Sequence, residues 1–265
     1  MMTTWVSSQL LTHPQLLWLA MLRPLGLCVM FPLLGSRSLG SALLRNALIL
    51  AFTLPLLPPW LHQYAPTIGA RADAAFIFQE ILIGVLIGFV AALPFWALDS
   101  AGFIIDTLRG SSMASVLNPS LGEAASIFGI LFVQAFIALF FLQGGLEQVL
   151  SVLYRSYQII PPGTPLRFSR HWLTLLLSQW HMLFTLCLSF ALPAIIAMVL
   201  TDLAIGLINR SAQQLNVFFL AMPIKSFMVL LILLACLPFA FQPYFDYLTR
   251  FSTTLSGLLQ AMRDE

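Results

Sequence analysis

The sequence predicts an all-α protein that lies in or against a membrane, built from kinked helical hairpins in a single domain covering residues 1–265. Three observations predict this fold: the composition, the length of the apolar stretches, and the chemistry of the connections between them. The chain is 60% hydrophobic and 8% charged, with a mean hydropathy of +0.94, whereas soluble domains carry roughly 25% charged residues. The net charge of +2, with no run of basic residues, argues against a nucleic-acid partner.

The apolar stretches are the expected helices. A helix needs about 20 residues to cross roughly 30 Å of hydrocarbon. Four uncharged stretches suit this, and two earlier ones contain Arg23 and Arg45. In chain order the six stretches are residues 16–34, 42–60, 81–98, 124–146, 172–201 and 226–245. The pattern therefore predicts about six spans.

The connections between these stretches carry turn chemistry rather than the sequence of a soluble domain. They read "GSRSLGS", "PPWLHQYAPTIGARAD", "SVLNPSLGE" and "IIPPGTPLRFSR", all rich in glycine, proline, serine or asparagine. Prolines also lie inside the apolar segments, at Pro24, Pro94, Pro193, Pro223 and Pro238. Because proline removes a helical hydrogen bond, each is expected to kink or interrupt its helix.

Charged residues lie within or beside the apolar stretches, where each would cost about 2.5–3.5 kcal/mol if it faced lipid at mid-bilayer. They are Arg23, Arg45, Glu80, Asp99, Asp106, Arg109, Glu123, Asp202, Arg210 and Lys225. Such a set cannot all face lipid. Either these groups pair inside a bundle, or they line water, or the helices do not cross the bilayer in the usual sense.

The spacing of these charges favours inward pairing. Asp99, Gly102, Asp106 and Arg109 follow steps of three, four and three, and Asp202, Gly206 and Arg210 follow steps of four and four. Each set therefore lies on one face of a helix, with a glycine at which another helix can approach. Three interpretations stay open for the two stripes: structural pairing between helices, a proton or ion relay, or the lining of an aqueous pore.

A third small-residue face follows Glu80. Gly84 and Gly88 form a small-xxx-small motif that Ala92 extends, which favours close packing of helices. No phosphate-binding loop, nucleophile elbow or HExxH motif occurs, and the cysteines and histidines lack metal-ligand spacing. The sequence thus predicts no catalytic residue, no cofactor and no metal site.

Residues 192–227, "LPAIIAMVLTDLAIGLINRSAQQLNVFFLAMPIKSF", resemble the FliR/SctT family, the membrane export-gate subunits shared by bacterial flagella and type III secretion injectisomes. The residues that carry the resemblance are Leu192-Pro193, Asp202-Leu203, Gly206-Leu207, Asn209-Arg210, Gln214-Leu215-Asn216, Met222-Pro223 and Lys225. Arg23, Pro32 and Arg45, then Glu80, Gly84 and Gly88-Phe89, agree in order. The element Asp106-x-x-Arg109-Gly110 looks more like the injectisome branch than the flagellar one.

The resemblance implies a core component of the type III protein secretion export gate, without enzymatic turnover. With partner subunits it would form the entry channel through which unfolded substrates cross the bacterial inner membrane. The implied partners are SctR/FliP-like, SctS/FliQ-like, SctU/FlhB-like and SctV/FlhA-like subunits and the secreted proteins. The helices would then be raised toward the periplasm within the secretion basal body and packed against these partners.

In relatives, the loop that follows the Asp/Arg stripe projects toward the channel and helps to plug it. By position, Met113 and Val116 would be the apolar plug side chains, and Ser111, Ser112 and Ser115 would make the loop compliant. Two other functions compete with an export gate. One is a small secondary transporter or ion-coupled channel that uses Asp99, Asp106 and Asp202. The other is a membrane enzyme with Glu123 or His171 as its base.

Overall fold

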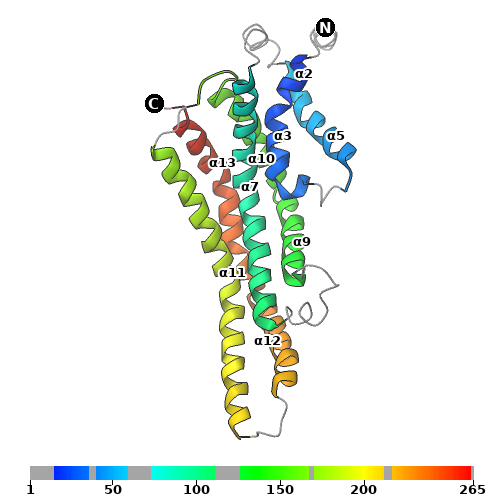
Figure 1. The fold of residues 1–265 in the computed structure, drawn as a ribbon, viewed down its shortest axis with the longest axis vertical. Helices are drawn as coiled ribbons and strands as arrows, with labels where there is room; N and C mark the ends of the chain where they lie inside the picture. The colour runs from blue at the N-terminus through cyan, green and yellow to red at the C-terminus, as the bar shows by residue number, and fades with distance from the viewer. Residues whose placement is uncertain are drawn as a thin grey trace. The chain divides into compact units, whose positions relative to one another are not determined.

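The computed structural model describes residues 15–35, 40–58, 73–110, 126–166, 170–211 and 217–263. The helices are α2 (Gln15–Ala20), α3 (Leu22–Met30), α5 (Ala42–Thr53), α7 (Ala74–Arg109), α9 (Ile127–Leu142), α10 (Gly145–Ile159), α11 (Arg170–Ser211), α12 (Val217–Ala240) and α13 (Gln242–Ala261) (Figure 1). Two short 3₁₀ turns are η1 (Pro32–Leu34) and η2 (Leu54–Leu56). No strand occurs among these described residues, so the all-α prediction is confirmed for them.

Three helical segments are long and apolar enough to cross a membrane, counting only described residues: Ala74–Arg109, Trp172–Arg210 and Ala221–Ala261. The bent pair α9 and α10 would be a fourth if the two helices counted as one span. At the five prolines singled out in the sequence the helix is not interrupted, because Pro24, Pro94, Pro193, Pro223 and Pro238 all lie inside helices that continue past them.

The first two apolar stretches differ from the prediction of full spans. In the structure they give shorter apolar helical segments, Leu17–Met30 and Ala42–Leu56. Proline marks a change of helix type in both: Pro32 begins η1 one residue after α3, and η2, which follows α5, contains proline at its second position. The backbone nitrogen of proline carries no hydrogen and cannot donate a hydrogen bond, so the α-helical hydrogen-bond pattern changes to 3₁₀ turns there.

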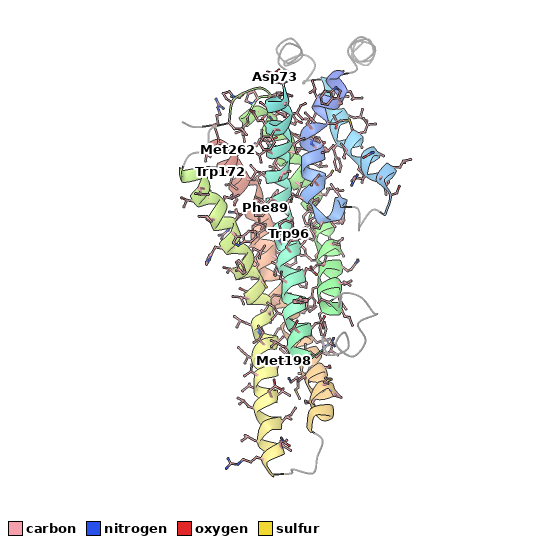
Figure 2. The ribbon with its side chains drawn as sticks, in the orientation of Figure 1. Asp73, Phe89, Trp96, Trp172, Met198 and Met262 are labelled. Carbon is pink, nitrogen blue, oxygen red and sulfur yellow. The ribbon has the colours of Figure 1, made fainter. Side chains whose placement is uncertain are left out.

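The chain divides into two compact units. Unit 1 contains Met1–Leu93, Phe140–Gln179 and Leu248–Glu265. A buried cluster in this unit joins α2 and α3 to η2, α7 and α10; its members are Leu19, Ala20, Leu22, Leu56, Leu57, Phe76 and Tyr157. Trp172 of α11 and Met262, which follows α13, line one small cavity and lie close together in Figure 2.

Unit 2 contains Pro94–Leu139 and Trp180–Tyr247. Its core is aromatic, and the rings come from α7, α9, α11, α13 and the residue before α13. The ring centroids of Phe95 and Phe136 are 5.0 Å apart, those of Phe132 and Phe190 are 4.7 Å apart, and Tyr244 lies 5.6 Å from Phe136. The Tyr244 hydroxyl donates a hydrogen bond of 3.0 Å to the Leu186 carbonyl oxygen. Edge-to-face aromatic pairs of this kind stabilise a core beyond their area burial.

Glycines allow α3 and the first part of α7 to approach closely within unit 1 (Figure 1). A Cβ atom on Gly84 would overlap the Arg23 carbonyl oxygen and lie 3.0 Å from the Gly26 Cα. A Cβ atom on Gly88 would lie 3.1 Å from the Leu27 Cα. The small-xxx-small face is therefore a helix-packing face, and its backbone contacts leave no room for side chains.

We expect Gly84→Ala to destabilise the folded chain by about 2 kcal/mol, because the added methyl group meets backbone atoms that cannot rotate away. The matched control is Gly257→Ala in α13, where no atom lies within 4 Å of the new Cβ. Here alanine is expected to stabilise the helix by about 0.5–1 kcal/mol. Unfolding midpoints of the full-length chain in detergent, titrated with SDS, would measure both effects. A Gly84→Ala midpoint above the native value would contradict the close approach.

Candidate functional site

An ion pair between Arg23 of α3 and Glu80 of α7 is buried in unit 1. The Arg23 Nε and Nη2 atoms lie 2.5 and 3.0 Å from the two Glu80 carboxylate oxygens, so the pair is bidentate. Arg23 is 0% exposed and Glu80 is 2% exposed. Two charges removed from water in this way are stable only when each finds an opposite charge and further hydrogen bonds.

Arg23 also donates such further hydrogen bonds to α10 and to the residue that follows it. Its Nη1 donates to the Ser156 Oγ at 3.2 Å, and its Nη2 donates to the Ile160 carbonyl oxygen at 2.7 Å. The guanidinium carbon lies 4.2 Å from the centre of the Tyr157 ring, a cation–π contact. Since Ile160 is the C-cap of α10, a cation here also faces the negative end of that helix. One side chain thus joins three helices.

In unit 2, Asp106 joins the end of α7 to the start of α9. Its Oδ1 accepts a hydrogen bond of 2.7 Å from Arg109, and its Oδ2 accepts bonds from the Ser126 hydroxyl at 2.8 Å and the Phe128 backbone nitrogen at 3.0 Å. Ser126 in turn accepts a bond from the Gly129 nitrogen at 2.8 Å, which makes it an N-cap. A carboxylate at the positive end of a helix is stabilised by the helix dipole.

The rest of the same face of α7 approaches α9 through two glycines. A Cβ on Gly102 would overlap the Gly129 backbone and lie 2.7 Å from the Phe128 carbonyl carbon. A Cβ on Gly129 would lie 2.8 Å from the Asp99 Oδ1, although the Asp99 side chain is exposed. Residues of this face of α7 thus lie along the contact between α7 and α9. Asp106 is buried in that contact, and Asp99 lies at the edge of it.

Asp202 of α11 pairs with Lys225 of α12, at 2.6 Å from its Oδ1 to the lysine Nζ. The pair differs from the expectation of burial, because the Asp202 side chain is 53% exposed in the chain alone. Arg210 is exposed, and nothing in the described residues lies within 4 Å of a Cβ on Gly206. The physical reason is that, among the described residues, α12 contacts this stripe through Lys225 at Asp202, whereas no atom lies close to the Gly206 position.

Large apolar side chains are exposed on the same two helices. On α11 they include Leu203 at 61% and Leu207 at 68% exposed, and on α12 Phe227 at 62% and Leu234 at 84%. Isolated exposed apolar residues are common, but many on the same two helices indicate contact with lipid or with other proteins.

The predicted plug residues Ser111, Ser112, Met113, Ser115 and Val116 lie outside the described residues, as does Glu123. The residues on either side of this segment are described. Arg109 precedes it and Ser126 follows it, and both bond to Asp106. Among described residues, no group of three or more His, Cys, Asp or Glu side chains could hold a metal ion.

Ser126, Ser156 and Tyr157 complete these clusters but were not predicted from the sequence. Ser126 could have been found, because a serine that directly precedes an apolar helix is a typical N-cap. Ser156 and Tyr157 carry no such local signal, since their role depends on a guanidinium more than a hundred residues earlier.

Known proteins are similar to this chain along most of its length. The family model described as "Bacterial export proteins, family 1" matches residues 15–251. The chain is 49% identical over 228 residues to "Secretion system apparatus protein SsaT" of Salmonella typhimurium, a match that covers 85% of this chain and 88% of the relative.

Two further relatives help to place the chain within the family. It is 39% identical over 228 residues to "Yop proteins translocation protein T" of Yersinia pestis, covering 85% of this chain and 87% of the relative. It is 28% identical over 167 residues to "Flagellar biosynthetic protein FliR" of Bacillus subtilis, covering 62% and 64%. The first two relatives are therefore more similar to the chain than this flagellar protein is.

Proposed function

The chain belongs to the bacterial export proteins of family 1, the FliR/SctT family, and on that premise we propose that it is an inner-membrane subunit of a type III secretion export apparatus. The observation that carries the proposal is the 49% identity to SsaT over 85% of the chain. The higher identity to SsaT and to the Yersinia protein favours the injectisome branch over the flagellar branch. A single family model covers residues of both compact units, which supports one functional domain.

The proposed role is to form, with SctR-like and SctS-like subunits, the entry channel for unfolded substrates, next to SctU-like and SctV-like proteins. Two features support it. The apolar surface of α11 and α12 offers a large area for neighbouring subunits or lipid. The charged residues Arg23, Glu80 and Asp106 are held inside the chain, where they stabilise helix contacts.

The proposed gate is the plug formed by Ser111, Ser112, Met113, Ser115 and Val116, which lie in segment 111–125. Because Asp106 bonds to Arg109 before the segment and to Ser126 and Phe128 after it, the two ends of the segment are tied together. In this proposal Met113 and Val116 fill the channel, and the unbranched methionine side chain suits an irregular seal.

Glycine at both Met113 and Val116, or deletion of residues 111–117, is expected to make the closed apparatus leak ions and small molecules, because the apolar seal is lost. The leak is measured as dye or ion entry into cells that carry the complete apparatus but are not secreting. The matched control is Ile68→Gly, which removes a similar apolar side chain from another connection.

Two results would be informative against the proposal. Tight membranes with normal secretion in both altered strains would remove the plug role. If the native chain failed to co-purify with any other export-apparatus subunit, the proposed function itself would fail.

A further inference from the structure

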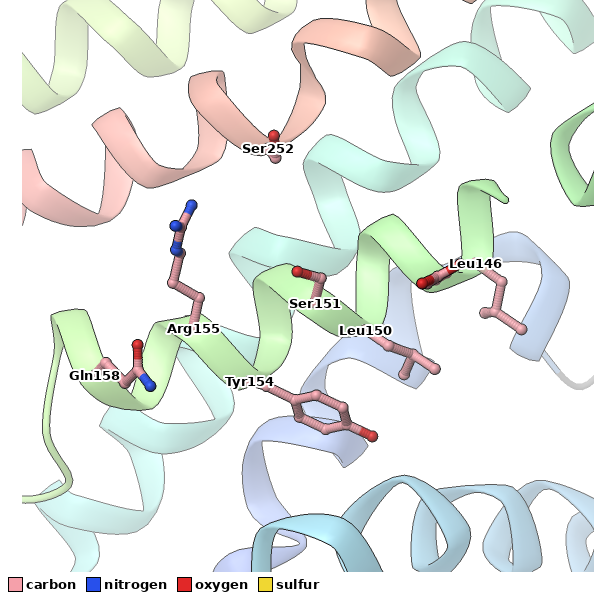
Figure 3. Close-up of a pocket in the computed structure, with 8 residues that line it drawn as sticks. Leu146, Leu150, Ser151, Tyr154, Arg155, Gln158 and Ser252 are labelled. Atoms are coloured by element: carbon pink, nitrogen blue, oxygen red, sulfur yellow. The ribbon is translucent and has the colours of Figure 1, made fainter. Parts of the chain in front are cut away.

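Two adjoining hollows lie between α10 and α13 in unit 1, and Figure 3 shows residues that line the larger one. They have volumes of about 770 and 390 Å³ and share Arg155 and Gln158. We refer to them together as the α10–α13 groove. Along α10 it runs from Leu146 to Ile159, which corresponds to about 20 Å of helix.

The chemistry of the groove differs from that of the exposed surface of α11 and α12. Hydroxyl and carboxamide groups line both walls: Ser151 and Gln158 on α10, and Ser252, Ser256 and Gln260 on α13. Leu146, Leu150 and Ile159 add apolar contact area. This mixture of apolar and hydrogen-bonding groups is typical of protein–protein contacts, whereas lipid tails need an apolar lining.

The charges of the groove are unevenly distributed. Among the residues that the structure describes, the smaller hollow is lined by Arg155 and Arg263 and by no carboxylate, while Glu147 lies in the larger hollow eight residues before Arg155. Figure 3 shows the Arg155 side chain extending from α10 toward the α13 side, where Ser252 lies. By contrast, the buried Arg23 and the partly buried Arg109 each contact a carboxylate of the chain.

We propose that the α10–α13 groove binds a helix of another protein, one that presents a carboxylate to Arg155 and Arg263. Eight residues are about two helical turns, or 12 Å, so the same helix carries a lysine or arginine two turns away, opposite Glu147. A phosphate group would need only the smaller hollow and would leave the extended polar walls unused. The inference rests on the proposed function, because the partner is sought among the other membrane subunits of the export apparatus.

The test uses bacteria that carry the complete apparatus, with a photo-crosslinking residue in place of Ser256 in the full-length chain. The expected product is an adduct with one other subunit, mapped by mass spectrometry to a helix that has an acidic and a basic residue two turns apart. Arg155→Glu with Arg263→Glu is expected to lower the adduct yield about tenfold. When the acidic residue of the partner helix is replaced by lysine in the same strain as the double variant, the adduct yield should be restored.

The matched control is Arg250→Glu, an exposed arginine of α13 that does not line the groove; it should leave the yield unchanged. Three outcomes overturn the inference: adducts with phospholipid only, a yield unchanged by the double charge reversal, or an adduct within the chain to Asp264 or Glu265.

Co-purification of the apparatus from the same cells separates the two proposals. If the subunits co-purify with the native chain but no groove adduct with them forms, the groove inference fails and the proposed function stands. If none co-purifies with the native chain, the proposed function fails.

Discussion

Glu80→Leu is expected to destabilise the folded chain by about 3–5 kcal/mol, because it leaves the Arg23 guanidinium buried without a carboxylate. Leucine is close in size to glutamate, so the loss reflects the unpaired charge rather than a cavity. The remaining partners of Arg23, the Ser156 hydroxyl and the Ile160 carbonyl oxygen, are neutral and cannot replace the charge. The measurement is the loss of helical circular dichroism when the full-length chain in detergent is titrated with SDS.

The double variant Arg23→Met, Glu80→Leu tests the cause. Replacing both members of a buried pair by apolar groups is often neutral, so the double variant should unfold later than Glu80→Leu alone. Glu147→Leu, at an exposed carboxylate of α10, is the matched control and should change the midpoint little. If the double variant were as unstable as the single one, poor packing rather than unpaired charge would be the explanation.

Asp106→Ala is expected to cost about 3 kcal/mol, since it removes the partner of Arg109 and leaves the Ser126 hydroxyl and the Phe128 amide without their acceptor. The loss should begin locally. Hydrogen exchange of a peptide covering the first turns of α9 should become faster at SDS concentrations that leave the rest of the chain folded. Assembly with the other export subunits should fall in parallel, because the tied ends of segment 111–125 come apart.

The neighbouring Thr107 provides the control, because its exposed hydroxyl donates to the Phe103 carbonyl oxygen of its own helix. Thr107→Ala should change neither exchange nor assembly. Asp106→Asn should restore part of the exchange protection, since an amide oxygen can still accept the Phe128 bond. Equal behaviour of Asp106→Ala and Thr107→Ala would show that the Asp106 carboxylate is solvated.

Helical spacing explains which parts of the site the sequence could predict. The steps from Asp99 to Arg109 placed these residues on one face, and Asp106 and Arg109 do bond to each other in the structure. The sequence also marked Arg23 and Glu80 as charges that need partners. It did not pair them, because 57 residues separate them and pairing across helices depends on which helices pack together.

Other parts could not be predicted from spacing alone. The ion-pair partner of Asp202 is Lys225 on the following helix. Spacing alone indicated only that Arg210 shares a helix face with Asp202. The helices α10 and α13 were not among the expected spans, because their polar faces lower the hydropathy on which that prediction relied. Amphipathic spacing, rather than hydropathy, would have revealed both helices.

The exposed apolar side chains of α12 also have a consequence for the cell that makes this chain. Leu234 is 84% exposed and Phe239 is 79% exposed. A copy made in excess of its partner subunits therefore presents an uncovered apolar surface to other membrane proteins. We therefore expect synthesis to be matched to that of the other subunits, and surplus copies to be short-lived. Overproduction from a plasmid should shorten the half-life of the chain, and simultaneous supply of its neighbours should lengthen it.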